Sequence, residues 1–229
     1  MTDESLHAAV VDIGKVTNLG WVVEGPSVNG CGDDIDKCID TLAAALKKGP
    51  LALGFEAPMF VPYGRERSEL DKARKGEGDR SFSAAAGACV LTKGLVTVPY
   101  ILQGLRHRAE SAMPTFKWRE RLSERDLLLF EAFVVHVGKS VDHEGCARLA
   151  IRQFPKEWEK RAILESAIDE PCTMNLLAAM LLRMGWSHEV KMLSEPCLVV
   201  RAGKTPSDKP PRLGSRHHLS PTTQNRSLV

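Results

Sequence analysis

The first fifty residues alternate between apolar runs and turn residues and then change to a helical spacing. Residues 7–23 hold two apolar runs separated by turn residues, which predicts an antiparallel hairpin with room for a short third strand after it. Over residues 35–46 apolar side chains recur every three or four positions. This spacing predicts a helix that Asp33 or Asp34 can cap.

A single acid interrupts or ends three of the apolar runs that are expected to form strands. Asp12 lies in the first run, Glu56 ends the run 51–56, and Glu131 lies in the run 127–135. A carboxylate in an apolar strand must have its desolvation compensated, by a metal ion or by hydrogen bonds. Alternation along a strand also places Glu56 on the side that carries small residues, which leaves room beside it.

The remainder of the chain is predominantly helical in pattern. The charged segment 59–80 has turn residues but no clear period, which is typical of a functional or mobile loop. Proline is expected to interrupt the apolar segment 83–105. The helices expected after residue 80 are 83–105 in one broken or two separate pieces, 142–154, 155–169 and 172–184, and a last edge strand is expected at 196–201.

The overall composition is that of an ordinary globular protein. Of the 229 residues 43% are hydrophobic and 26% are charged, and the formal net charge is only +2. This balance gives no support to a large basic nucleic-acid footprint, although a local groove remains compatible with it. The length suits one domain: residues 1–201, with a helical insertion at about 59–126, followed by a disordered polar tail at 202–229.

The cysteines and the N-terminus indicate the compartment. The six cysteines lie far apart, with no C-x-x-C pair and no zinc-type spacing, which predicts reduced and mostly buried thiols. The polar, acidic N-terminus is unlike a signal peptide, and no apolar run reaches the ~20 residues that cross a bilayer. We therefore expect a cytoplasmic protein without membrane segments.

The order of the expected elements favours an α/β fold with helices on both faces of a sheet. A crossover through the helix at 35–46 permits the strand of Asp12 to lie beside the strand of Glu56. Neighbouring carboxylates repel each other, and a divalent cation relieves the repulsion. Mg²⁺ or Mn²⁺ held in this way can activate a water against a phosphodiester.

Several short motifs resemble the ribonuclease H-like fold, in particular its predicted nucleases of the Holliday-junction-resolvase-like type. In chain order these motifs are Val11-Asp12-Ile13-Gly14, Asn18-Leu19-Gly20-Trp21, Gly54-Phe55-Glu56-Ala57-Pro58, Leu129-Phe130-Glu131-Ala132-Phe133 and Asp142-His143-Glu144. The resemblance implies a mixed five-stranded sheet whose first three strands are antiparallel. It also implies a metal site built from the first strand, the fourth strand and the last core helix.

Carried over by position, the resemblance assigns Asp12, Glu56 and Glu131 to the strand acids of that family. Where the family places an acid on the helix, this chain has Gly145-Cys146-Ala147. Glu144 and Asp142 lie one turn or less away as substitutes, but at about 100° per residue Glu144 points away from the direction of position 146. The site is then either rebuilt with Glu144 or no longer catalytic.

The leading hypothesis is therefore a metal-dependent nuclease, a hydrolase that acts on nucleic acid with Mg²⁺ or Mn²⁺. The acids expected to carry catalysis are Asp12, Glu56, Glu131 and Glu144, and the expected metal ligands are Asp12, Glu56 and Glu144. The cations expected to contact phosphate are Arg74, Arg80 and Lys139. One alternative is a non-catalytic scaffold of the same fold that binds a partner. A further alternative is an actin-like ATP-binding domain, suggested by the Asp-Ile-Gly turn alone.

Overall fold

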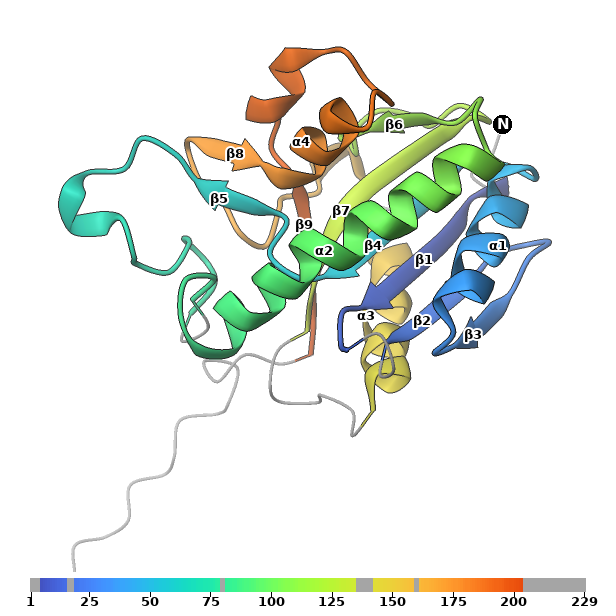
Figure 1. Cartoon of the computed structure of the whole chain (residues 1–229), viewed down its shortest axis with the longest axis horizontal. Helices are drawn as coiled ribbons and strands as arrows, with labels where there is room; N and C mark the ends of the chain where they lie inside the picture. Colours follow the sequence, from blue (N-terminus) through green and yellow to red (C-terminus); the bar gives the residue numbers. More distant parts are fainter. Residues whose placement is uncertain (1–4, 16–18, 79–80, 135–141, 159–160, 204–229) are drawn as a thin grey trace, which may run out of the picture.

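A mixed sheet of seven strands forms the centre of the molecule in the computed structural model, which describes residues 5–15, 19–78, 81–134, 142–158 and 161–203 (Figure 1). Its strands are β1 (His7–Asp12), β2 (Gly20–Glu24), β3 (Gly30–Gly32), β4 (Leu51–Glu56), β6 (Met113–Thr115), β7 (Asp126–Val134) and β9 (Leu198–Ala202). The strand order is β3-β2-β1-β4-β7-β6, with β9 also paired to β7. The α/β class is confirmed, and the expected count of five strands is too low by two.

Pairing within the sheet is antiparallel at one side and parallel at the other. β1, β2 and β3 are joined by antiparallel pairing, as expected, and all pairs from β1 to β4 and onward are parallel. The two additional strands exist because β7 is nine residues long. β6 pairs with its first three residues and β9 with its last five, so each uses a different half of one long strand.

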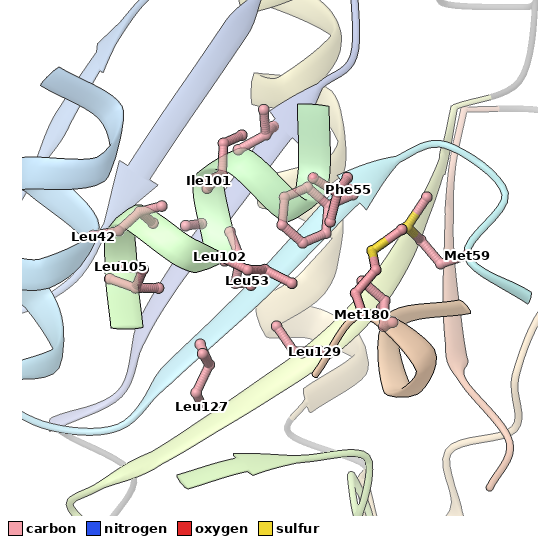
Figure 2. Close-up of a cluster of buried hydrophobic side chains, with 14 of the residues drawn as sticks. Leu42, Leu53, Phe55, Met59, Ile101, Leu102, Leu105, Leu127, Leu129 and Met180 are labelled. Atoms are coloured by element: carbon pink, nitrogen blue, oxygen red, sulfur yellow. The ribbon is translucent and has the colours of Figure 1, made fainter. Parts of the chain in front are cut away.

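Helices cover both faces of the sheet, as the element order predicted. The helices α1 (Ile35–Leu46), α2 (Ala85–Arg108) and α4 (Leu176–Arg183) share one hydrophobic core with the sheet, here called the α2 face. Figure 2 shows part of this core, with Leu42, Ile101 and Leu105 directed toward Leu53. The opposite α3 face is covered by α3 (His143–Trp158). Phe154 of α3 stacks on Phe130 of β7 within a second core.

Alternation along β1 and β4 divides their side chains between these cores as predicted. Val11 and Phe55 lie in the core of the α2 face, whereas Val10 and Ala52 lie in that of the α3 face. The helix expected from residue 35 is also confirmed. Its cap is Asp34, whose side chain accepts hydrogen bonds from two backbone amides of the first turn.

Three helix predictions are wrong in their limits. α2 is one continuous helix of 24 residues that contains Pro99, so the missing amide does not break it. α3 likewise continues past Pro155 to Trp158, so no second helix begins at that proline. In the described part of the expected helix 155–169, α3 is followed by a 3-10 turn, η4 (Arg161–Ile163). A helix was expected from residue 172, but residues 173–175 form strand β8 (Thr173–Asn175), which pairs with β5 (Phe60–Pro62).

The outlying segments complete the fold. The predicted loop 59–80 contains β5 and the 3-10 turn η3 (Arg67–Glu69), and another 3-10 turn, η5 (Val190–Ser194), follows α4. The last edge strand is confirmed as β9, which reaches Ala202 and so enters the expected tail by one residue. The tail from residue 204 onward lies outside the described residues.

Among the described residues, α2 is the one helix whose length and composition would suffice to cross a membrane. Core helices of soluble proteins pass the same test. Val98, Ile101, Leu102 and Leu105 of α2 are fully buried against the sheet and α1. Only 28% of the apolar window of α2 is buried, so the expected absence of membrane segments stays a prediction.

Candidate metal centre

Asp12 and Glu56 end two neighbouring parallel strands in the same register. The Cα atoms of the two residues are partners in the β1–β4 pairing, so their side chains leave the sheet at the same edge. Strand alternation sends both to the α3 face, because Asp12 follows the parity of Val10 and Glu56 that of Ala52. The expectation that these two carboxylates meet is confirmed.

The third member of the group is Cys146, from the first turns of α3. One ligand atom from each of Asp12, Glu56 and Cys146 lies within 4.8 Å of the other two. Asp12 and Cys146 are only 3% and 1% exposed, respectively. The group therefore joins two strands and a helix at a water-poor position beside the sheet edge.

A glycine on β2 allows α3 to approach this closely. Gly20 is the register partner of Asp12. A Cβ atom at Gly20 would lie 2.2 Å from the carbonyl carbon of His143 and 2.3 Å from the amide nitrogen of Glu144. Any larger side chain would therefore push the start of α3, and Cys146 with it, away from β1 and β4.

His143 contacts the group from the same helix turn. Its Nδ1 lies 2.9 Å from Oδ2 of Asp12, and its side chain is partly exposed. The imidazole is therefore placed to orient the Asp12 carboxylate, and it becomes an ion-pair partner of Asp12 when protonated. No role for His143 was predicted, because a histidine on the inner stripe of a helix is usually only a core residue.

Glu144 is directed elsewhere. Its Oε1 accepts hydrogen bonds from Nε and Nη2 of Arg148 at 3.0 and 2.7 Å, one helical turn away on the outside of α3. The structure therefore brings Cys146, and not Glu144, to the two strand carboxylates. The reason is helical geometry, since positions two residues apart differ in direction by about 200°.

Glu131 lies on the opposite face of the sheet from Asp12 and Glu56. It is the register partner of Phe55 on β4, so it points to the α2 face and does not join the metal group. Arg74 donates to both of its carboxylate oxygens, from Nη2 to Oε1 at 2.7 Å and from Nη1 to Oε2 at 2.8 Å. The backbone amide of Met59 adds a third hydrogen bond at 2.9 Å.

Arg74, predicted to contact phosphate, is buried at 1% exposure. Its five N–H donors are directed to Glu131, to Glu77 and to the carbonyl oxygen of Phe60. Burial lowers the pKa of the guanidinium, but the charges and hydrogen bonds of Glu131 and Glu77 outweigh burial and raise that pKa above its ordinary value. In this structure Arg74 thus neutralises buried carboxylates.

The other two predicted phosphate contacts, Arg80 and Lys139, lie outside the described residues. Beside Glu56 the surface is hollowed by a cavity of about 210 Å³. The cavity extends from Glu56 past Pro58 to the first turn of α2 and to Phe133 of β7, and small and apolar side chains form most of its wall. Glu131 and Glu77 also line this cavity, whereas Asp12 and Cys146 do not, so Glu56 is the one member of the metal group that borders it.

The donor set decides which metal ion the group fits. Mg²⁺ prefers six oxygen ligands and is a poor match for a group that includes a thiol. Two carboxylates and a thiolate are suitable for a softer divalent ion of the transition series or zinc. All six cysteines lie in the described residues and none forms a disulfide, so the Cys146 thiol is available in its reduced form.

Comparisons of the chain with protein-family models, with curated proteins and with solved structures found no match. The function is therefore inferred from the site itself and from the motifs in the sequence.

Proposed function

We propose that this protein is a divalent-metal-dependent hydrolase of phosphodiester bonds in nucleic acid, built on a ribonuclease H-like fold and acting in the cytoplasm. The observation that carries the proposal is the register of β1 and β4, which puts Asp12 and Glu56 side by side beneath α3. The antiparallel pairing of β1, β2 and β3 beside parallel strands supports the proposal, because the resemblance implies a mixed sheet of that kind.

The chemistry requires acids that can hold a cation together with the attacking water. A bound divalent cation supplies Lewis-acid activation of a water and stabilises charge on the leaving oxygen. Asp12 and Glu56 would hold the ion, and His143 would keep the Asp12 carboxylate oriented through the 2.9 Å contact. In this proposal the scissile group would enter through the cavity that Glu56 lines.

The acids of the original set have different parts in this proposal. Glu131 is bound by Arg74 on the other face of the sheet, so in this proposal it stabilises the fold and does not contact the substrate. Glu144 is paired with Arg148, so Cys146 takes its expected place as the helix ligand. The phosphate contacts expected from Arg80 and Lys139 remain predictions.

A cleavage assay tests the proposal. The full-length protein is incubated with branched, single-stranded and duplex oligonucleotides and with Mg²⁺, Mn²⁺ or Zn²⁺, in parallel with Asp12→Asn and Glu56→Gln. We expect cleavage by the wild type and a loss of at least about 100-fold in both variants. Asp33→Asn, an exposed acid before α1, serves as the control and should cleave normally. Equal cleavage by Asp12→Asn and wild type would contradict the proposal.

A non-catalytic scaffold of the same fold is the second candidate, and one observation favours it. The helix position that would carry an acid is Cys146, so the set of carboxylates at the centre is reduced to two. In that case the metal group stabilises the start of α3 without turnover. This candidate predicts metal binding with no cleavage of any substrate in the assay above, and loss of the stabilisation by metal in Asp12→Asn.

A further inference from the structure

We propose that Cys146 makes this centre selective for a thiophilic divalent ion, zinc above all, and that magnesium is a poor occupant. The inference rests on the metal site of the proposed function and specifies its occupant. It departs from the Mg²⁺ or Mn²⁺ expected from the sequence, because those ions were assigned to a set of three carboxylates.

The distances within the group fit a small tetrahedral ion. Bonds of about 2.0–2.3 Å to one tetrahedral zinc ion place its ligand atoms roughly 3.3–3.8 Å apart. The ligand atoms of Asp12, Glu56 and Cys146 already lie within 4.8 Å of one another. Side-chain movements of about 1 Å therefore close the site, without any change in the strands or in α3.

The donor types favour zinc over magnesium. A thiolate stabilises zinc and disfavours magnesium, which needs near-octahedral oxygen ligands and retains its waters. Three protein ligands with one open position are the pattern of zinc sites that bind a water or a substrate. Glu56 is the member of the group that lines the neighbouring cavity, so a water or substrate would approach the open position from that side.

The surroundings support the same ligand set. Oδ2 of Asp12 lies 2.9 Å from Nδ1 of His143, a contact of the type that orients metal-binding carboxylates. Gly20 permits the approach of α3 that brings the thiol to the carboxylates. The placement of Cys146 thus depends on the fold and not on a mobile surface segment.

The test uses cobalt as a spectroscopic probe and zinc and magnesium as competitors. The background is the full-length protein with the exposed thiols replaced, Cys31→Ser, Cys89→Ser and Cys172→Ser, so that surface cysteines do not bind the ions. We expect Co²⁺ to give near-ultraviolet absorption from thiolate-to-metal charge transfer at one ion per chain. Zinc should abolish that absorption at concentrations at least about 100-fold lower than magnesium.

Two variants at one position identify the thiol. Cys146→Ser should lose the charge-transfer absorption and bind zinc at least about 100-fold more weakly. Loss of an outer partner of a metal ligand already costs about 10- to 100-fold in affinity, and loss of a direct ligand should cost at least as much. Cys146→Asp should bind Mn²⁺ and Mg²⁺ better than the background protein does, because it restores a carboxylate set. A merely structural role of Cys146 would not reverse the preference between ions.

The outcomes separate this inference from the proposed function. Charge-transfer absorption and a preference for zinc, without any cleavage of nucleic acid, would support the inference and contradict the proposed nuclease function. Equal affinity for magnesium and zinc, or absorption retained in Cys146→Ser, would overturn the inference whether or not the protein cleaves nucleic acid. If Cys146→Ser does not fold, the absence of cobalt charge transfer in the background protein overturns it in the same way.

Discussion

Two carboxylate groups on opposite faces of one sheet show two different ways of keeping an acid in an apolar strand. On the α3 face, Asp12 and Glu56 lie beside the thiol of Cys146, and a partly exposed histidine, His143, contacts Asp12. On the α2 face, Glu131 and Glu77 share ion pairs with the single positive charge of the buried Arg74.

The difference lies in what the surrounding chain supplies. In the segment 59–78, Arg74 lies above the ring of Phe60 and reaches Glu131. On the α3 face the residues that meet are instead two carboxylates and a thiol, whose ligand atoms lie within 4.8 Å of one another. We therefore expect the first group to bind an ion and the second to stabilise the fold.

Removal of the buried arginine should have the largest effect on stability. Arg74→Met leaves Glu131 and Glu77 buried without their counter-charge, which should lower the free energy of unfolding by about 3–5 kcal/mol. Urea denaturation measures the change. Arg108→Met is the matched control, because Arg108 pairs with Asp40 at the surface and should cost only about 0–1 kcal/mol. Similar losses in the two variants would contradict a special role for the buried pair.

Metal binding should distinguish the two groups of acids. At an ion concentration of 100 times the dissociation constant, binding to the folded state alone stabilises it by about 2.7 kcal/mol. Wild type should gain this amount and Asp12→Asn should gain none. Glu131→Gln should be less stable without metal yet keep the full gain, because it lies on the other face. Thermal or urea unfolding with and without zinc gives both values, and loss of the gain in Glu131→Gln would disprove the separation of the groups.

A methyl group at Gly20 should affect the α3 face alone. Gly20→Ala places a Cβ atom 2.2 Å from the backbone of His143, and overpacking of this kind costs about 1–3 kcal/mol. The variant should also lose most of the stabilisation by zinc, since α3 must move away from Asp12. Gly30→Ala is the control, because its nearest contact is a methyl group of Thr41 at 3.2 Å. Unchanged zinc binding in Gly20→Ala would show that the approach of α3 is not required.

A smaller, pH-dependent effect is expected at the other end of β1, where a third buried polar group lies. His7 is fully buried, with Nε2 3.0 Å from Oγ of Ser27. Burial lowers the pKa of His7 below its ordinary value of 6.5, so below that pH the unfolded chain binds more protons than the folded one. Stability should therefore fall as the pH drops from 6.5 toward the folded-state pKa.

The His7→Gln variant isolates this effect. Its free energy of unfolding should depend less on pH below 6.5 than that of the wild type, while both proteins behave alike above 6.5. Urea unfolding at a series of pH values makes the comparison. An identical pH dependence in the two proteins would show that protonation of His7 is not coupled to folding.

Local patterns in the sequence predicted the part of the centre that depends on strands. The period of a strand predicted which residues share a face with Glu56, and a crossover through α1 permitted the strands of Asp12 and Glu56 to be neighbours. That both acids point to the same face follows only from the register of β1 and β4. The cap at Asp34 was predictable for a similar reason, since capping is local.

The remainder depends on contacts between distant segments. Glu131 was grouped with the other acids because its run looked the same, yet its parity on β7 sends it to the α2 face. Its partner Arg74 lies 57 positions away in a segment without a period, so no pattern could connect them. Cys146 was recognised as the position of the missing acid, but only the close approach of α3 at Gly20 shows that its thiol joins the centre.

Anomalous diffraction from crystals of the zinc-loaded protein tests the central claim most directly. We predict one zinc ion bonded at about 2.0–2.3 Å to carboxylate oxygens of Asp12 and Glu56 and to Sγ of Cys146. A fully loaded protein whose zinc lies elsewhere, with these three side chains unbound to it, would contradict the account.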